Sequence, residues 1–315
     1  MLNNNFYKGE KLMKKTFALL LVLVMLVGMV ALSGCASNPQ PAAADKPEVS
    51  ESEQAPSESA ESETPAETEQ QEFRVGMECN YAPFNWTQTD DSNGALEISS
   101  GGFAGGYDVE IAKRIAEGLG KKLVIVKTEW DGLPPALTSG KIDAIIAGMS
   151  PTEERKATVD FTDNYYTSEL VVVVKKDSQY ANATSLADFS GAKITGQLNT
   201  FHVTVIPQIE GVDQQTAMES FPAMIVALES GAIDGYISER PSAVSAMESN
   251  PDLTFVEFPE GEGFEASPDD VAVAVAVAKG QEDLISSINE ILAGISEDER
   301  QELMNAAVKN QPVSE

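Results

Sequence analysis

The fold is decided by residues 107–147, which read YDVEIAKRIAEGLGKKLVIVKTEWDGLPPALTSGKIDAIIA. The apolar side chains of residues 107–118 recur at helical spacing, and glycines at the end of that run terminate the pattern. Residues 123–126 and 142–147 are short apolar runs typical of buried strands, with a predicted helix over 133–139 between them. This alternation indicates a parallel sheet with helices on its faces.

The same alternation extends in both directions from this stretch. Upstream, residues 73–77 predict a short strand, and downstream, residues 171–174 predict a fully apolar one. A second set of strands and helices spans 192–237, and a strand over 271–278 precedes a helix over 284–292. Two such units, with clefts at their strand ends, predict a bilobed α/β architecture. A single-domain doubly wound enzyme is the alternative that this pattern leaves open.

The composition argues against several classes of protein. The chain has 315 residues, 42% of them hydrophobic, which suffices for one large core or two modest ones. Its formal net charge of -29 argues against a nucleic-acid partner, because such a protein must neutralise phosphates with clustered lysines and arginines. Residues 36–72 are rich in Ala, Pro, Ser and Glu, so we expect an acidic, flexible tether there.

A signal peptide is predicted over residues 1–35. Basic residues precede an apolar run over 17–30, and small residues follow it. The ending Leu-Ser-Gly-Cys at 32–35 resembles the lipobox of bacterial lipoproteins, which implies cleavage before a diacylated Cys35 and an extracytoplasmic, membrane-anchored protein. A single transmembrane anchor is the alternative, although the apolar run is shorter than the roughly 20 residues that span a bilayer.

The few cysteines and histidines limit the chemistry that the chain can support. Cys79 is the only other cysteine, so no disulfide framework is available, and we expect it to be a small buried residue. His202 is the only histidine, and no spacing of Cys, His and carboxylates suggests a metal site. We therefore expect neither a metal nor a cofactor. Residues 296–300 predict an exposed helix start capped by Ser296.

Four segments carry a resemblance to a known family. They are residues 78–84 (ECNYAPF), 106–112 (GYDVEIA), 130–137 (WDGLPPAL) and 140–166, which ends in the specific run SPTEERKATVDFTDNYY. Their order and spacing resemble those of the polar amino acid solute-binding proteins of ABC importers, extracellular family 3. The resemblance covers residues 73–315.

This resemblance implies a type II periplasmic-binding-protein fold, in which two α/β lobes joined by two hinge strands close around the ligand. We expect lobe 1 over 73–168, with 273–315 returning to it, and lobe 2 over 169–272. The implied partners are a free polar or basic amino acid and an ABC permease, and we expect a monomer. A dehydratase-like enzyme on the same fold and a ligand sensor for a membrane receptor are the alternative functions.

The resemblance places the ligand carboxylate at Arg155, whose planar guanidinium offers two parallel donors and stays charged. Ser150 and Pro151 predict a helix start, with Ser150 as the cap and Pro151 inside the helix. The free backbone N–H groups of this helix start would favour an anion. Residues 196–201 (GQLNTF) match a family turn whose following helix N-terminus also binds the carboxylate, and Thr200 would be the contact from lobe 2. Asn199 stands where most relatives carry glycine, and asparagine tolerates the left-handed backbone that such a turn needs.

Glu239 stands where the family usually has an aspartate for the ligand ammonium, and the Ser150 hydroxyl and the carbonyl of Gly148 would complete that shell. Tyr81 and Trp130 match wall positions that hold the ligand side chain. Glu78 aligns with an acidic position that reaches the side chain of basic ligands. The candidate ligand contacts are therefore Glu78, Tyr81, Trp130, Gly148, Met149, Ser150, Arg155, Asn199, Thr200, Phe201 and Glu239.

Without the resemblance, the same residues have simpler readings. Arg155 would be an exposed surface arginine, and Glu239 would be a rim carboxylate paired with Arg240. Tyr81 and Trp130 would be ordinary core residues. The motif match favours the binding roles, and Glu78 with Trp130 favours lysine, arginine or a related polar ligand, because an indole face can hold a cation.

Overall fold

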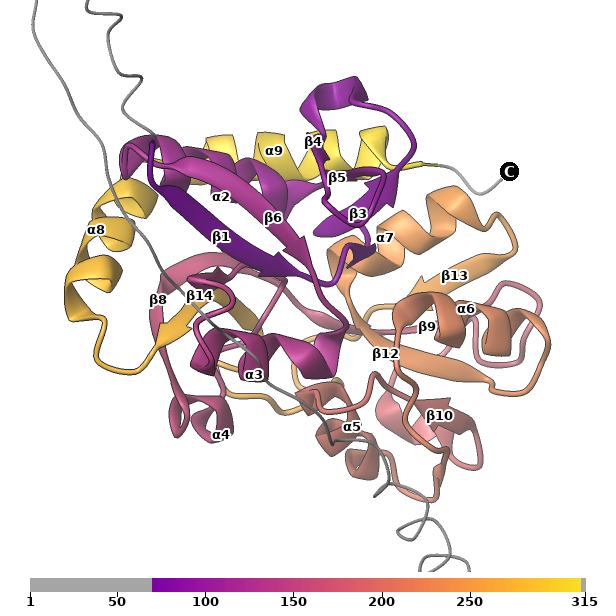
Figure 1. Cartoon of the computed structure of the whole chain (residues 1–315). Coiled ribbons are helices and arrows are strands. Elements are labelled where there is room, and N and C mark those ends of the chain that lie inside the picture. Colours follow the sequence, from indigo (N-terminus) through magenta and orange to yellow (C-terminus); the bar gives the residue numbers. More distant parts are fainter. Residues whose placement is uncertain (1–69, 313–315) are drawn as a thin grey trace, which may run out of the picture. The chain divides into compact units, whose positions relative to one another are not determined.

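The computed structural model describes residues 70–312 (Figure 1). The predicted signal peptide, Cys35 and most of the acidic tether lie outside the described residues. Within the described part, the chain forms two five-stranded sheets and a smaller four-stranded one. The predicted arrangement of two α/β units is therefore present.

Sheet 1 has the strand order β6-β1-β7-β14-β8. Its strands are β1 (Glu72–Met77), β6 (Lys122–Lys127), β7 (Ala144–Ile145), β8 (Val159–Thr167) and β14 (Ala272–Ala278). β1 runs parallel to β6 and β7, whereas β14 runs antiparallel to β7 and β8. Sheet 1 and its helices are called the first lobe. These helices are α2 (Tyr107–Gly118), α3 (Leu133–Thr138), α4 (Glu153–Lys156), α8 (Glu282–Ala293) and α9 (Glu297–Asn310). α2 contacts β6 and α8 contacts β8, while α3 contacts β1 and β7.

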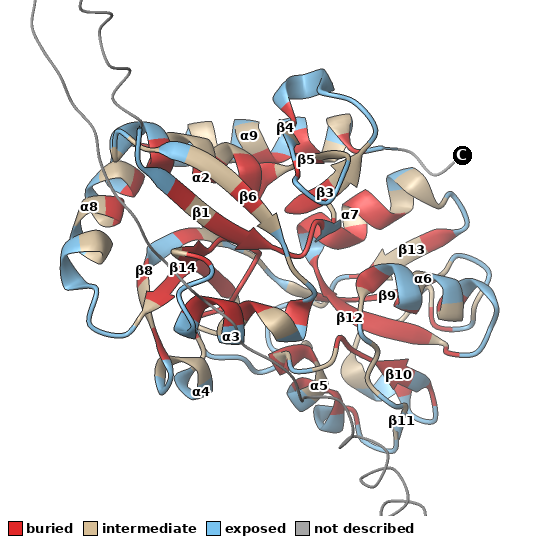
Figure 2. Ribbon diagram, in the orientation of Figure 1, coloured by how far each residue is buried: buried red, intermediate tan, exposed pale blue. Residues whose placement is uncertain are grey.

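Sheet 2 has the strand order β11-β10-β12-β9-β13. Its strands are β9 (Leu170–Lys175), β10 (Lys193–Thr195), β11 (Asp213–Gln214), β12 (Gly235–Glu239) and β13 (Leu253–Val256). The helices α5 (Phe201–Val205), α6 (Phe221–Glu229) and α7 (Arg240–Ser249) pack against this sheet, each contacting β12. All five residues of β12 are buried, which is typical of a central strand covered on both faces (Figure 2).

The small sheet has the order β2-β3-β5-β4, and its strands β3 and β5 contact α2 of the first lobe. Its strands are β2 (Asn80–Tyr81), β3 (Asn85–Gln88), β4 (Leu96–Glu97) and β5 (Phe103–Gly105). Short 3-10 turns lie at Ser92–Gly94, Trp130–Gly132, Leu186–Phe189 and Ile206–Gln208. The hairpin of β2 and β3 directly follows β1, and its Tyr81 contacts Glu239 of β12 and Phe221 of α6.

The chain crosses between the two sheets twice, once between β8 and β9 and once between β13 and β14. At the crossing, the N–H of Ser168 donates a hydrogen bond to the carbonyl of Val271, with N and O 2.9 Å apart. The N–H of Arg240 donates to the carbonyl of Glu169 at 3.0 Å, so the first crossing is also tied to the end of β12. Two neighbouring connections of this kind allow the lobes to rotate about one axis.

Several local predictions agree with the structure, and one strand is shorter than expected. The helix over 107–118 has the predicted ends, and the Ser296 hydroxyl caps α9 by accepting a hydrogen bond from the Glu299 N–H at 3.2 Å. The strand expected over 142–147 is assigned only at Ala144 and Ile145, the two residues that pair with both β1 and β14. The adjoining residues still bond to β1, because the N–H groups of Asp143 and Ile146 donate to the carbonyls of Arg74 and Gly76, at 2.8 and 3.3 Å.

Helix α2 begins against the turn that follows Tyr81. The backbone N–H groups of Tyr107 and Asp108 donate to the carbonyls of Pro83 and Phe84, at 3.0 and 2.8 Å. The helix start can approach this closely because Gly106 has no side chain. Its φ is 126°, and a Cβ there would lie 2.3 Å from the Phe84 oxygen.

Candidate ligand-binding site

Arg155 is the cation of the candidate site and lies where the two lobes meet. One guanidinium nitrogen donates to the Ser150 carbonyl at 2.9 Å, and the other donates to the Asn199 carbonyl of the second lobe at 3.1 Å. The guanidinium carbon lies 5.1 Å from the ring centroid of Trp130, within the range of a cation–π contact. Burial lowers the pKa of Arg155 to about 10, so the side chain still carries its charge at neutral pH.

The short helix α4 that carries Arg155 is capped differently from the prediction. We expected Ser150 as the cap, but the helix begins at Glu153, and the Thr152 hydroxyl accepts the hydrogen bond from the Arg155 N–H at 3.4 Å. Pro151 lies before the helix rather than inside it. The Ser150 side chain therefore does not cap α4, and Ser150 lines the cavity described below.

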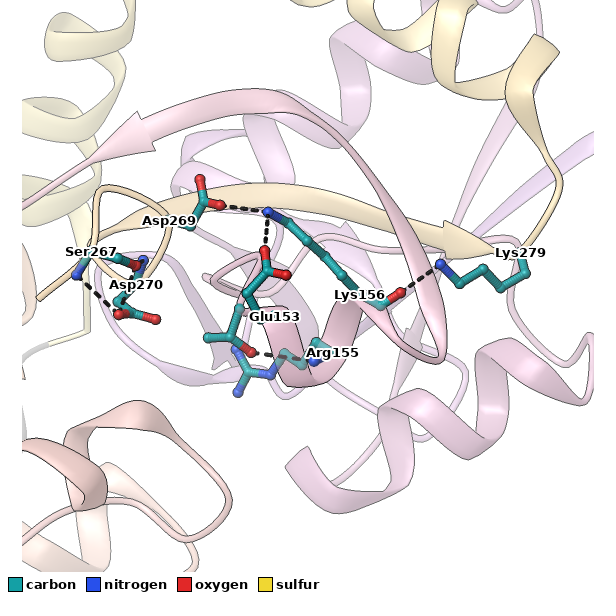
Figure 3. A network of polar contacts seen from close by, with 8 residues as sticks. Glu153, Arg155, Lys156, Ser267, Asp269, Asp270 and Lys279 are labelled. Atoms are coloured by element: carbon teal, nitrogen blue, oxygen red, sulfur yellow. Dashed lines mark hydrogen bonds and ion pairs between the residues drawn. The ribbon is translucent and has the colours of Figure 1, made fainter.

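A network of charges holds α4 against the segments before and after β14 (Figure 3). Lys156 donates to Glu153, with N and O 3.1 Å apart, and pairs with Asp269 in the second crossing segment. Lys279, at the end of β14, donates to the backbone carbonyl of Lys156 and pairs with Asp160 at 2.7 Å. These contacts tie the helix of Arg155 to the segment that connects the lobes.

The second lobe contributes the turn before α5. Asn199 adopts the left-handed conformation expected for this position, with φ 56°. Its side-chain amide donates to Asp131 of the first lobe at 2.9 Å. Thr200 is the N-cap residue of α5 without a side-chain capping bond, and its hydroxyl donates to the Gln197 carbonyl at 2.7 Å. Phe201 begins the helix and is buried.

Glu239 is the anion of the candidate site and ends strand β12. It is only 5% exposed, and Arg240 pairs with Glu257 instead, so the reading of Glu239 as a rim carboxylate paired with Arg240 is wrong. Tyr81 of the first lobe donates its hydroxyl hydrogen to Glu239 Oε2. Burial opposes ionisation of this carboxyl, but the charge and hydrogen bond of His202 and the hydrogen bond of Tyr81 outweigh it, so the pKa of Glu239 is lowered.

Glu78 faces the second lobe through Gln197. The Gln197 amide nitrogen lies 3.3 and 3.2 Å from the two Glu78 oxygens and 3.2 Å from the Glu219 carbonyl. Because all three of these neighbours accept hydrogen bonds, the NH₂ group must point towards them. The side-chain oxygen of Gln197 is thus the atom left for any other partner.

A small cavity brings most of these residues together. Its volume is about 10 Å³, far too small for an amino acid, so a ligand can enter only if the lobes separate. It is lined by Tyr81, Trp130, Gly148, Ser150, Arg155, Gln197, Thr200, Phe201, His202, Phe221 and Glu239. A larger cavity of about 440 Å³ shares only Phe221 with it and lacks the converging Arg155 and Glu239.

Eight of the eleven candidate contacts therefore line one cavity, whereas Glu78, Met149 and Asn199 do not. Sequence reasoning did not assign roles to Gln197, His202 and Phe221. Phe221 stacks on Tyr81, with ring centroids 4.3 Å apart. Gln197 stood inside the recognised turn, but Phe221 is more than 100 residues from Tyr81, and no local pattern reports such a contact.

A buried polar network supports the first-lobe wall of the cavity. Asp108 accepts hydrogen bonds from the Tyr165 hydroxyl and the Asn85 amide, each at 2.7 Å. Tyr165 in turn accepts from the Gly148 N–H at 3.2 Å, and Asn85 accepts from the Cys79 N–H at 2.6 Å. Burial raises the pKa of Asp108 to about 6 despite these bonds. Cys79 is buried, as expected, and burial raises the pKa of its thiol to about 12.

Comparison with known proteins identifies the family. Residues 73–308 match the family model described as bacterial extracellular solute-binding proteins, family 3. The chain belongs to this family. It is 33% identical to a probable histidine-binding protein of Campylobacter jejuni over 61% of this chain and 70% of that protein. It is 31% identical to the L-cystine-binding protein TcyJ of Escherichia coli (strain K12), over 71% of this chain and 77% of that protein.

Solved structures agree with this assignment. An amino acid ABC transporter substrate-binding protein of Streptococcus pneumoniae, bound to L-arginine, matches with a TM-score of 0.63 and 26% identity. The match covers 76% of this chain and 94% of that one. The bilobed type II fold expected from the sequence is therefore confirmed. This member of family 3 is a solute-binding protein and not a dehydratase, because its relatives are named as binding proteins.

The described residues of this solute-binding protein lack two features of other protein classes. Among residues 70–312, no helix is long and apolar enough to cross a membrane. Within the same range, no group of three or more His, Cys, Asp or Glu side chains is placed to hold a metal ion.

Replacing Glu78 with glutamine should stabilise the protein at neutral pH. Burial raises the pKa of Glu78 from 4.5 to about 7, and nearby Glu129 and Asp131 add to this shift against the Gln197 hydrogen bond. The native state therefore holds this proton more tightly than the unfolded state does. The resulting stabilisation is complete below about pH 4.5 and is lost as the pH rises to about 7.

Glu78→Gln cannot ionise, so its free energy of unfolding should exceed that of the wild type by about 3 kcal/mol above pH 7. The two proteins should converge as the pH falls to about 4.5. Urea titrations across this range measure the difference. Glu117→Gln, which removes an exposed carboxylate of α2 that is not among the groups that shift the pKa of Glu78, should follow the wild-type profile closely. A constant offset for Glu78→Gln at every pH would contradict the assignment.

Proposed function

We propose that this protein is an extracytoplasmic lipoprotein that binds a polar or basic amino acid by hinge closure and presents it to an ABC importer. The observation that carries the proposal is the convergence of Arg155 and Glu239 in one cavity between the lobes. A free amino acid carries a carboxylate and an ammonium on one carbon. Both groups can be buried only if each one is paired and hydrogen-bonded.

In this proposal Arg155 and the turn at Thr200 hold the ligand carboxylate, while Glu239, Ser150 and the Gly148 carbonyl hold the ammonium. Contacts of Arg155 with Asn199, and of Tyr81 with Glu239, join the lobes. A ligand that touches both lobes would replace these contacts and favour the closed state. The lobe boundaries we propose are 73–168 with 273–315, and 169–272.

The ligand side chain would lie between Tyr81 and Trp130 and approach Gln197. Because the Gln197 amide nitrogen is directed at Glu78 and the Glu219 carbonyl, its oxygen is available as an acceptor. An acceptor backed by a carboxylate favours side chains that carry N–H donors. We therefore propose arginine, lysine or histidine as the ligand, and the relatives are named for histidine, cystine and arginine binding.

A thermal-shift screen of the purified protein against the common amino acids tests this proposal. The bound ligand should raise the melting temperature by mass action, with about 4 kcal/mol of added stability at a concentration of 1,000 times Kd. We expect the largest shift with a basic amino acid. A shift with glutamine or cystine alone would keep the amino acid function but exclude Glu78 as the selector, and no shift with any amino acid would contradict the proposal.

The membrane anchor is proposed from the lipobox-like ending at Cys35, and two acyl chains are needed for stable anchoring. In cells grown with labelled palmitate, the wild type should incorporate the label and Cys35→Ser should not. Cys79→Ser is the matched control, because it removes the other cysteine and should incorporate the label as the wild type does. Labelling of Cys35→Ser would contradict lipidation at this residue. We propose that the anchored protein is a monomer that docks on the permease.

A further inference from the structure

His202, the only histidine of the chain, lies in the candidate site without an assigned role. It is on α5, only 3% exposed, and its Nε2 lies 3.1 Å from Oε1 of Glu239. Tyr81 donates to the other carboxylate oxygen. Nδ1 of His202 is buried and has no hydrogen-bond partner within residues 70–312.

The hydrogen bond to Glu239 determines which nitrogen of the His202 ring carries a hydrogen. Glu239 can only accept when it is ionised, so Nε2 of His202 must carry a hydrogen. The ring is then either neutral, with a bare Nδ1, or doubly protonated and cationic. A cationic ring would neutralise Glu239 inside a site from which water is largely excluded. A neutral ring leaves the charge of Glu239 uncompensated and free to attract another cation.

The ligand ammonium is that second cation. We propose that His202 is a specificity-determining residue that couples ligand capture to a proton: the ammonium binds at Glu239 only when His202 is neutral, and binding to the protonated protein expels the imidazole proton. This inference rests on the proposed amino acid site. It gives the protein weaker capture in acid and tighter capture near neutral pH, because the proton and the ligand compete for one carboxylate.

The other charged groups around the ring are few. From α4, Arg155 lines the same cavity and stays cationic at neutral pH. On β2, the Tyr81 phenol has a pKa well above its ordinary value because of burial and the nearby Glu239, so it stays neutral. Behind Gln197, Glu78 has a pKa near 7 and titrates in the range where histidine ordinarily does. Any experiment must therefore separate His202 from Glu78.

Proton counting separates them. Calorimetry of the full protein with L-arginine, in buffers of different ionisation enthalpy, measures the protons released on binding. The wild type should release more protons than Glu78→Gln, because a cationic ligand side chain near Glu78 also displaces the proton of that carboxyl. Glu78→Gln should still release protons, and its affinity should fall by up to about tenfold per pH unit towards acid. In the double variant Glu78→Gln/His202→Gln, which keeps an N–H donor for Glu239, the remaining release and the acid weakening should disappear.

The outcomes distinguish failure of this inference from failure of the proposed function. If His202→Gln releases as many protons as the wild type, or if Glu78→Gln removes the release, the inference is overturned while amino acid binding stands. If no amino acid binds, the proposed function fails, and the His202–Glu239 coupling is then tested in the ligand-free protein. Its single imidazole gives one assignable NMR signal, and at pH 6.5 Glu239→Gln should lower the protonated fraction of that ring. An unchanged fraction overturns the coupling.

Discussion

Replacing Arg155 with alanine should abolish measurable amino acid binding while leaving the protein folded. The guanidinium is the cation that faces the ligand carboxylate in the proposed site, and its loss leaves that carboxylate buried without a partner. Removing one partner of a buried charge pair costs about 3–5 kcal/mol, which corresponds to a loss of affinity of about 10²- to 10³-fold or more. Calorimetry with the ligand found in the thermal-shift screen measures this loss.

Two further variants make the test specific. Arg155→Lys keeps the charge but loses the planar pair of donors, so we expect an intermediate loss of binding. Arg114→Ala removes a half-exposed arginine of α2 that pairs with Glu299 at 2.7 Å, remote from the cavity, and should bind as the wild type does. If Arg155→Ala bound its ligand with unchanged affinity, the carboxylate would have to lie elsewhere.

Replacing Gly106 with alanine should cause the largest loss of stability among single-methyl additions in the first lobe. The φ of 126° at this position is one that residues with a side chain rarely adopt, and the added Cβ would lie 2.3 Å from the backbone oxygen of Phe84. Strain of this kind costs about 1–3 kcal/mol and overpacking about as much again. We expect the free energy of unfolding to fall by about 2–6 kcal/mol.

Gly140→Ala is the matched control, because this glycine also has a positive φ, 72°, but no atom lies within 4 Å of the added carbon. It should cost only the backbone strain, about 1 kcal/mol. Urea unfolding of both variants gives the comparison. Equal losses at Gly106 and Gly140 would show that the contact of α2 with the Phe84 turn is not tight.

The sequence predicts those parts of the fold whose cause is local. Helix α2 has its predicted ends because apolar periodicity and glycine act within one segment. The cap of α4 was mispredicted because Ser150 and Thr152 are both good caps on either side of Pro151, and only the backbone path decides between them. The short β7 shows the same limit, since its length depends on where β14, over 120 residues later, pairs with it.

In the candidate site, too, local sequence motifs predict some residues, whereas contacts between distant elements place the others. Arg155 and Glu239 were found from motif positions, but the burial of Glu239 depends on the central place of β12 in sheet 2. His202 and Phe221 reach the cavity through contacts with Glu239 and Tyr81. These partners come from other elements, so no spacing along the chain reports them.

The place of β14 has a consequence for the order in which the chain can assemble. All five strands of sheet 2 come from residues 170–256, so that sheet is complete before β14 emerges from the ribosome or the export channel. Among residues 70–312, the nine-residue β8 pairs with a single strand of sheet 1, β14. During synthesis or translocation, β8 therefore waits unpaired while the whole second lobe is added behind it. Unpaired strand edges invite aggregation, so this interval is when the chain most needs a chaperone.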